Sequence, residues 1–572
     1  MKRMVLWFAP AVLLASLAAA QEKPMPYVET IDVRIINVDA VVTDRKGRPV
    51  HGLTKDDFEL IENGHQIPIT NFFEVKPSEK PPQTDAAPAE TQPVAEQEPV
   101  EERRRRIVLF VDESTLHPFN RNRIFPALDD FVRQAMRPSD EVMIVSWNHD
   151  LKIELPFTTD VNAAHHILER LSSTTTSGAE RVRRLSDAQE RVLDVFEQAK
   201  MMGGEKPLME EGLREARQYA DAVFRDERAT TGAMNALMAS MAAVDGKKIL
   251  VFMTESLPAQ PGLEMFEFID GIRERFKDGR SRSAISDANR YSAEHEIQSI
   301  SDIANASGFT IYPIQAGSSA SDGAADVNPR LEMDMQIAVR GASNLKAVND
   351  AQPLRALASA TGGIAVVGSK NFELALDTIR KDFSSYYSLG YRASGEKVDR
   401  VRSLEVRVKN PDYRVRSRRS LVERSLESDL RDAVAANLFY PARGNEMKIA
   451  LHVGAPRVSG RKMSMPLEIV IPMDSLTLIP DGDDLTGQFD LYIGFLRKDG
   501  SVSKVDKRHQ QFRFAASAAE RRKEVRLVLQ LSGDVATSRI SVGVLDFVSH
   551  STGFAAQSII GSSDQDRASN RR

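Results

Sequence analysis

The sequence predicts an α/β fold in which helices cover both faces of a central, mostly parallel sheet. A small β unit precedes this domain and a β-sandwich-like region follows it. Between residues 107 and 383, short continuous apolar runs typical of buried parallel strands alternate with helical patterns. Residues 28–75, and the chain from residue 386 onward, instead alternate apolar and polar residues as antiparallel strands do. With 572 residues the chain is too long for one core, so we expect several domains.

Each element of the α/β series has its own local signal. Apolar runs predict strands, helical spacing of apolar residues predicts helices, and Gly362-Gly363 ends one of these helices. The expected strands are 107–111, 142–147, 151–155, 248–254, 309–314 and 364–367. The expected helices are 121–136, 163–171, 229–244, 286–306, 354–360 and 372–383. Strands that alternate with helices imply right-handed crossovers and a mostly parallel sheet.

The N-terminal β unit has clear turn signals but is small. Thr54 and Asp57 resemble a capping box that opens one helical turn, and Asn63-Gly64 between two apolar runs indicates a hairpin. About 50 residues is marginal for an independent core, so we expect this unit to pack on another region, such as the C-terminal one.

Two segments allow more than one interpretation. Residues 178–228 interrupt the α/β series with charged helical spacing, which predicts an inserted helical hairpin. This hairpin either lies on the domain surface or projects as an arm that binds a partner. The arginine run 103–106 before the first α/β strand indicates either an anionic partner or, more commonly, a solvated strand entrance.

The first twenty residues resemble a signal peptide. Lys2 and Arg3 precede an almost wholly apolar run, and Ala18-Ala19-Ala20 is a small-residue cleavage site. The alternative is an uncleaved anchor, although the run is short for a membrane span. No later apolar stretch approaches that length, so we expect an exported mature chain without a membrane span, periplasmic, secreted or surface-associated.

The complete expected organisation follows from these signals. Proline and glutamate dominate the segment between the first two units, as in a linker. The expected divisions are 1–20 signal peptide, 25–75 N-terminal β unit, 76–104 linker, 105–395 α/β domain with the insertion at 178–228, 396–425 β extension, and 430–562 C-terminal β-sandwich-like domain.

Composition excludes several classes of protein. The net charge is -5, so the chain as a whole offers no basic field for nucleic acid. The absence of cysteine excludes disulfides, thiolate zinc sites and lipidation at a lipobox cysteine. Neither the oligomeric state nor a partner's identity follows from these features.

Acidic residues follow the first α/β strand at the edge where open α/β sheets bind ligands. The sequence after residue 111 is Asp112-Glu113-Ser114-Thr115-Leu116. It resembles the Asp-x-Ser-x-Ser motif of von Willebrand factor type A domains, and the resemblance covers roughly residues 105–392. Residues 31–64, 386–395 (YYSLGYRASG) and 405–419 (EVRVKNPDYRVRSRR) resemble von Willebrand factor A-related proteins of acidobacteria. Neither resemblance implies a known reaction.

In that family, oxygen ligands from three loops hold a divalent cation, usually Mg²⁺, whose shell a partner's carboxylate completes. The resemblance implies Asp112 and Ser114 as the first two ligands, Thr231 as the threonine of the second loop, and Glu255 where aspartate is usual. Leu116 stands where the second serine belongs and cannot coordinate. Two of the five positions depart from the family's motif, so two other interpretations stay open. One is a degenerate site that binds a partner without metal, and the other is a set of loop acids with no binding role.

No catalytic motif stands out. None of the ten histidines lies in an HExxH helix, and there is no Gly-x-Ser-x-Gly elbow or Walker-type loop. His165 and His166 are expected to be exposed and to point to different helix faces. His117, close after Asp112, either approaches the site loop or, more commonly for such a spacing, lies near it by chance.

We therefore expect a non-enzymatic binding protein that recognises a protein partner through the carboxyl edge of the sheet. One alternative is a structural scaffold in an envelope assembly. The other is a carbohydrate-directed binder or enzyme that uses the C-terminal β domain, although that region has few aromatic residues and no tryptophan.

Overall fold

The computed structural model describes most of the chain. The described residues are 35–76, 104–202, 206–242, 244, 246–275, 283–317, 333–369, 371–392, 398–439, 447–460, 462–497, 502–519 and 523–559. The expected signal peptide, nearly all of the expected linker and the polar tail lie outside these residues. Among the described residues, no helix is both long and apolar enough to cross a membrane.

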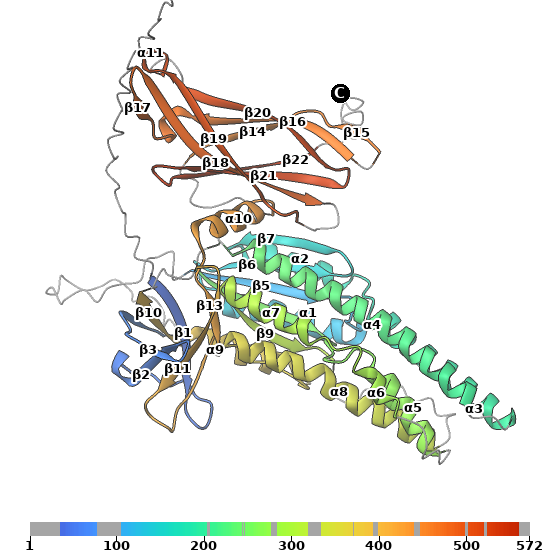
Figure 1. Ribbon diagram of the computed structural model, residues 1–572. Coiled ribbons are helices and arrows are strands. Elements are labelled where there is room, and N and C mark those ends of the chain that lie inside the picture. Colours follow the sequence, from blue (N-terminus) through green and yellow to red (C-terminus); the bar gives the residue numbers. More distant parts are fainter. Residues whose placement is uncertain are drawn as a thin grey trace, which may run out of the picture.

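A five-stranded sheet forms the centre of the α/β domain (Figure 1). Its order is β7 (Leu151–Thr158), β6 (Glu141–Trp147), β5 (Arg105–Asp112), β8 (Lys247–Thr254) and β9 (Phe309–Gln315). The β5–β6, β5–β8 and β8–β9 pairs are parallel, and only edge strand β7 runs antiparallel. Parallel strands put their carboxyl ends at one edge, so Asp112 and Thr254 end neighbouring strands there.

Helices cover both faces of this sheet. On one face α1 (Pro118–Ala135), α2 (Val161–Ser172) and α9 (Phe372–Ser384) pack over Ile107, Leu109 and Val111 of β5. On the other, α7 (Glu294–Ala306) and the ends of α4 (Lys206–Ser240) and α8 (Met333–Thr361) pack over Val108 and Phe110. Burial from both sides explains why β5 is a continuous apolar run, and the prediction of a mixed α/β fold is confirmed.

The arginines that begin β5 are buried rather than solvated. The Nε atom of Arg105 lies 3.0 Å from Asp140 Oδ1, and that of Arg106 lies 3.1 Å from Glu141 Oε2. Arg105 also lies over the ring of Phe383. The expectation of a solvated strand entrance is therefore wrong, because two acids that precede and begin β6 neutralise these guanidinium groups inside the protein.

The N-terminal strands pair with strands that follow the α/β domain. One antiparallel sheet has the order β12 (Arg414–Ser417), β1 (Ile35–Thr43), β10 (Tyr386–Arg392), β4 (Asn71–Val75). The other has the order β13 (Ser420–Val422), β11 (Val401–Val408), β2 (Phe58–Glu62), β3 (His65–Ile67). The two sheets share one core that includes Val38, Leu60 and Tyr387.

This pairing corrects two expected divisions. Strand β10 had been placed in the α/β domain, and the β extension had been treated as separate from the N-terminal unit; together they complete the core of that unit. The local turn signals are confirmed. Thr54 and Asp57 form the capping box around a 3-10 turn (Lys55–Asp57), and Asn63 and Gly64 have φ angles of 49° and 81° in the β2–β3 hairpin.

The insertion forms two long helices, α3 (Gly178–Met202) and α4 (Lys206–Ser240). Their facing residues, including Val192 and Tyr219, share a core with α5 (Leu263–Arg275), α6 (Ile285–Ala288) and α8. The pair thus packs along the domain, and its far end extends away from the sheet (Figure 1). The helix expected to start at residue 229 is not a separate element, because α4 continues through that position without a break.

Two antiparallel sheets make up the C-terminal unit. One contains β14 (Ala450–Val453), β16 (Lys462–Pro472), β15 (Arg457–Ser459) and β20 (Glu524–Asp534). The other contains β17 (Ile479–Asp481), β18 (Asp484–Arg497), β21 (Thr537–Asp546), β22 (Thr552–Ser558) and β19 (Asp506–Ala515), with a 3-10 turn (Met473–Ser475) before β17 and α11 (Ala516–Ala519) after β19. Helix α10 (Leu426–Ala436) lies between this unit and the α/β domain (Figure 1).

Candidate functional site

Asp112, at the end of β5, is the centre of a buried hydrogen-bonded group. Its Oδ1 accepts a hydrogen bond from the Ser114 hydroxyl at 2.5 Å, and its Oδ2 accepts from Thr115 at 2.9 Å and Thr254 at 2.8 Å. Thr254 ends the neighbouring strand β8, so two adjacent strand ends supply this group. All four side chains are buried. Three hydroxyl donors therefore satisfy the carboxylate within the protein.

Glu255 follows β8 and joins the same edge to helix α1. Its Oε1 accepts hydrogen bonds from the backbone N–H of His117 at 2.7 Å and from Asn120 Nδ2 at 3.0 Å. Its own backbone N–H donates to Thr115 Oγ1 at 3.1 Å. A carboxylate at the first turn of a helix is favoured by the free N–H groups and the positive end of the helix dipole. Glu255 thus anchors the start of α1.

Thr231 does not lie in a loop, so the prediction of its position is wrong. It is inside helix α4, where its hydroxyl donates to the carbonyl of Arg228 at 3.2 Å. Its neighbour Thr230 is the residue that reaches the sheet, because its hydroxyl accepts from Trp147 Nε1 at 2.9 Å. Trp147 ends β6 and pairs in register with Asp112. The helix therefore reaches this edge through Thr230.

The start of α3 covers the loop after Asp112. A Cβ atom on Gly178 would lie 2.5 Å from the backbone nitrogen of His117, and the N–H of Ser177 donates to the carbonyl of Glu113 at 3.0 Å. Asp112, Ser114 and Thr231 are all buried. Asp112 and Glu255 thus converge at one edge of the sheet, but the inserted helices close over the Asp112 side of it.

Arg181, one turn into α3, brings a positive charge to this covered edge. Its Nη2 donates to Ser256 Oγ at 3.2 Å, and Ser256 donates to Asp350 Oδ1 at 3.0 Å. Lys346 also pairs with Asp350. The charge of Arg181 favours the ionised forms of both Asp112 and Glu227. Sequence reasoning missed Arg181 and Glu227, because no local pattern in the insertion indicates which of its charges meet the sheet. It also missed the role of Thr254, which it treated only as the last residue of a strand.

Burial changes the acidity of the carboxyl groups at this edge. Desolvation raises the pKa of Asp112, although its three hydroxyl donors and Arg181 oppose the change. Desolvation likewise raises the pKa of Glu255, opposed by Asn120 and His117. For Glu227 on α4, desolvation raises the pKa well above its usual range, and neither of its carboxylate oxygens has a hydrogen-bond partner. Glu227 is therefore the least compensated acid of the group.

The four residues expected to hold Mg²⁺ do not fit that ion in this arrangement. Thr231 is held in a helix, Glu255 is bound to the start of α1, and only Asp112 and Ser114 contact each other. The guanidinium of Arg181 already provides positive charge to Asp112. A hard cation needs several oxygens converging on one point.

An aromatic side chain stands exposed beside this edge. Phe119, in the first turn of α1, is 62% exposed. The guanidinium of Arg123 lies 5.5 Å from its ring centroid and 5.2 Å from that of the buried Phe372. Glu255 holds the backbone two residues before Phe119, so a rigid support presents an exposed ring. Phenylalanine and arginine are among the residue types enriched in the cores of protein–protein interfaces.

Comparison with known proteins finds similar solved structures only at low sequence identity. No protein-family model and no curated protein matches this sequence. Among solved structures, an aerotolerance-related membrane protein from Bacteroides fragilis NCTC 9343 shares 13% identity, covers 48% of this chain and 97% of its own, and has a TM-score of 0.20. The von Willebrand factor domain of the type V pili tip protein Mfa5 from Porphyromonas gingivalis shares 10% sequence identity with this chain. The match covers 49% of this chain and 94% of that domain, with a TM-score of 0.22.

A von Willebrand factor type A protein from Catenulispora acidiphila shares 9% identity over 81% of this chain and 68% of its own, with a TM-score of 0.20. Solved structures similar to this chain thus include von Willebrand factor type A proteins. At these identities and scores the similarities carry no argument about activity or partners. The resemblance of the flanking segments to acidobacterial proteins finds no support among them.

Proposed function

We propose that this chain is an exported, non-enzymatic binding protein that recognises a protein partner at the carboxyl edge of its α/β sheet. The observation that carries the proposal is the exposed ring of Phe119 beside the buried Asp112–Glu255 edge. Export rests on the N-terminal sequence, with its charged start, apolar run and small-residue cleavage site.

The structure of this edge favours recognition without a metal. The hydroxyls around Asp112 and the bond from His117 to Glu255 are made within the protein, so the loop from residue 113 to 117 is fixed before any partner arrives. Binding to a fixed surface avoids the entropic cost of ordering a loop. We infer that the degenerate motif supports the edge, while the partner contacts the exposed residues around it.

Alanine substitution of Phe119 tests this function. Proximity labelling in the host, with the full chain as bait, should identify a partner whose labelling falls at least about tenfold in Phe119→Ala, as for a central aromatic contact. The matched control is Val528→Ala, since Val528 is 68% exposed but lies on β20 of the C-terminal unit. Equal labelling by Phe119→Ala and wild type would contradict recognition at this edge. Loss only on deletion of residues 430–560 would support the scaffold alternative.

Calorimetry tests magnesium binding separately from partner binding. The arrangement described here predicts no heat of binding at millimolar Mg²⁺, which is roughly the weak end of protein sites for hard cations. Binding in the wild type that Asp112→Ala abolishes would show that the edge rearranges to accept the ion. Circular dichroism of Asp112→Ala is the control, because removing a buried hydrogen-bonded carboxylate also affects folding.

A further inference from the structure

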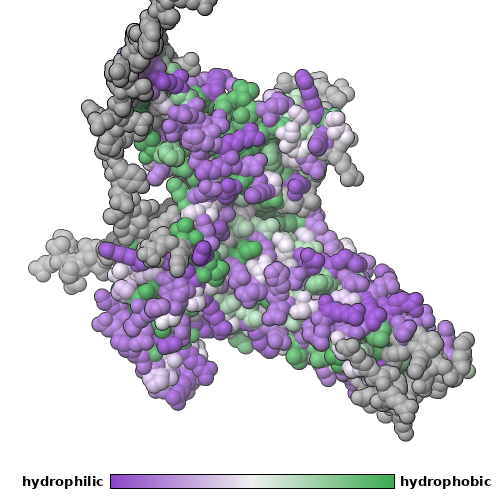
Figure 2. All heavy atoms as spheres, in the orientation of Figure 1, coloured by the Kyte–Doolittle hydropathy of each residue, from purple (hydrophilic) through white to green (hydrophobic). Residues whose placement is uncertain are grey.

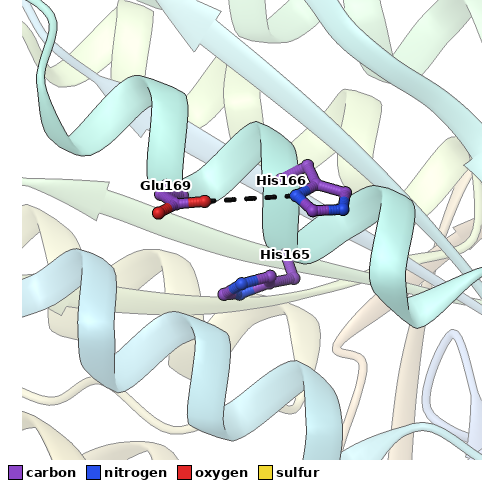
Figure 3. A group of neighbouring side chains, drawn as sticks. All are labelled: His165, His166 and Glu169. Carbon is purple, nitrogen blue, oxygen red and sulfur yellow. Dashed lines mark ion pairs between the residues drawn. The ribbon is translucent and has the colours of Figure 1, made fainter.

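We propose that His165, His166 and Glu169 on helix α2 form a binding site for a divalent transition-metal ion of the Zn²⁺ type. One ligand atom from each residue lies within 4.8 Å of those of the other two. Figure 3 shows the three side chains on one helix, His165 and His166 next to each other and Glu169 three positions after His166, with a dashed line between Glu169 and His166. The rings of the two histidines are 5.4 Å apart at their centroids, so these neighbours come together although they leave the helix in different directions.

The ligand atoms are close enough for a metal to draw them together. Zinc holds nitrogen and oxygen ligands at about 2.0–2.2 Å, which puts tetrahedral ligands roughly 3.4 Å from one another. Side chains that start within 4.8 Å reach that separation through small rotations. Glu169 and His166 are both highly exposed, at 70% and 74%, and His166 Nδ1 lies 4.0 Å from Glu169 Oε2. Neither packing nor a strong hydrogen bond between them opposes this rotation.

Asp129 on α1 fixes the third ligand. Its Oδ2 lies 3.0 Å from His165 Nδ1 and 3.1 Å from Arg133 Nε. When Nδ1–H donates to this carboxylate, the lone pair of Nε2 is available to a metal. A carboxylate that receives the second N–H of a ligating histidine also orients the ring and raises its basicity. Asp129 is therefore a positioning residue rather than a ligand.

The helix that carries the three residues is itself rigid. Asp160 caps its start by accepting from the N–H groups of Asn162 and Ala163. The opposite side of the helix is buried in the core against the five-stranded sheet, through Ala164, Leu168 and Leu171. The backbone positions are thus set by folding, and only exposed side chains have to move when an ion binds.

The donor set determines the class of metal. Two imidazoles and one carboxylate suit zinc and its neighbours, whereas Mg²⁺ and Ca²⁺ prefer oxygen ligands alone. Three protein ligands leave one tetrahedral position for water. The site is distinct from the Asp112 edge, because neither histidine forms part of the group around that carboxylate.

Titration of the purified, untagged protein with ZnCl₂ tests the proposal. We expect saturable binding of one ion, and a loss of affinity of at least about tenfold in His165→Ala and in Glu169→Ala. Asp129→Asn, which touches no metal, should weaken binding by about 10- to 100-fold as an orienting residue does. Circular dichroism should show no change in any of these variants, since the altered side chains are not in the core.

Two matched variants separate this site from general histidine or charge effects. His295→Ala removes an exposed histidine from α7, and Asp130→Asn removes an exposed carboxylate next to Asp129. Both should bind zinc as the wild type does. The proposal is overturned if the wild type shows no saturable zinc binding, or if His165→Ala and His295→Ala bind equally well. Competition with MgCl₂ should leave the zinc affinity unchanged.

Discussion

Two buried carboxylates at the covered edge of the sheet differ sharply in their surroundings. Asp112 accepts three hydroxyl hydrogen bonds, whereas both oxygens of Glu227 lack partners although the residue is only 4% exposed. Desolvation and the charges of Asp350 and Glu296 raise the pKa of Glu227 against the opposing effect of Arg181. An uncompensated buried charge is costly, so burial favours the protonated form of Glu227 in the folded protein.

The substitution Glu227→Gln should therefore stabilise the protein, and increasingly so as pH rises. In the unfolded chain a glutamate loses its proton near pH 4.3. Because the folded pKa is raised, wild-type stability is highest below the unfolded pKa and falls as pH rises toward the folded one. The neutral amide avoids this loss, which approaches about 1.4 kcal/mol for each pH unit inside that window. Urea denaturation at about pH 5 and about pH 8 measures the difference.

Glu211→Gln is the control for this prediction, since Glu211 is an exposed carboxylate on the same helix. It should change stability little at either pH. A Glu227→Gln variant whose advantage is the same at both pH values would show that Glu227 is ionised throughout.

At the residue scale, sequence reasoning identifies acids at strand ends but not their partners. The convergence of Asp112 and Glu255 follows from parallel strands ending at one edge, and the shared contact through Thr115 bears this out. Thr231 was misplaced because the family resemblance implied it as a loop threonine, although the helical spacing before it continues through it. Arg181 lies far away in sequence and meets the edge only through tertiary packing.

At the scale of elements, the start of α3 depends on a glycine. A Cβ on Gly178 would lie 2.3 Å from the carbonyl carbon of Leu116 and 2.5 Å from the nitrogen of His117. Both are backbone atoms, which cannot rotate away as a flexible side chain does. Gly178 thus permits α3 to close over the Asp112 loop and to bring Arg181 to it.

Gly178→Ala should destabilise the protein by about 1–3 kcal/mol, the usual cost of overpacking. Gly232→Ala provides a matched comparison, because Gly232 is an exposed position inside α4 and nothing lies within 4 Å of its added Cβ. It should stabilise the protein by about 0.5–1 kcal/mol through helix propensity. Urea denaturation of both variants measures the two effects. Equal effects would mean that α3 does not press on the loop.

Strands and helices with strong periodicity were predictable, while their partners were not. The apolar run at 107–111 predicted strand β5 because helices cover both faces of that strand. The Asn63-Gly64 turn signal predicted the β2–β3 hairpin. The pairing of β1 with β10, however, joins residues about 350 positions apart. Period-two patterns indicate strands but carry no information on which distant strand completes the sheet.

At the scale of the whole molecule, α10 connects the C-terminal unit to the α/β domain. Val434 faces β18 and β21, where Cβ atoms on Gly494 and Gly543 would lie 3.2 and 2.6 Å from its methyl groups. Ala436 instead joins the core over the α/β sheet. On the face shown in Figure 2, hydrophilic residues cover much of both units and apolar ones gather in places between them. One short helix thus contributes to the cores of two units.

Val434→Ala should loosen the C-terminal unit without unfolding the α/β domain. The substitution removes two methyl groups from a fully buried position, which costs about 1.5–3 kcal/mol when the cavity is included. Domains with separate cores unfold in separate transitions unless their interface is large and apolar. Differential scanning calorimetry should therefore show one transition moving to lower temperature while another stays in place. Val528→Ala, exposed on β20, should move neither. If all transitions move together in Val434→Ala, α10 couples the two units into one cooperative body, and a partner bound at the sheet edge would then stabilise the C-terminal unit as well.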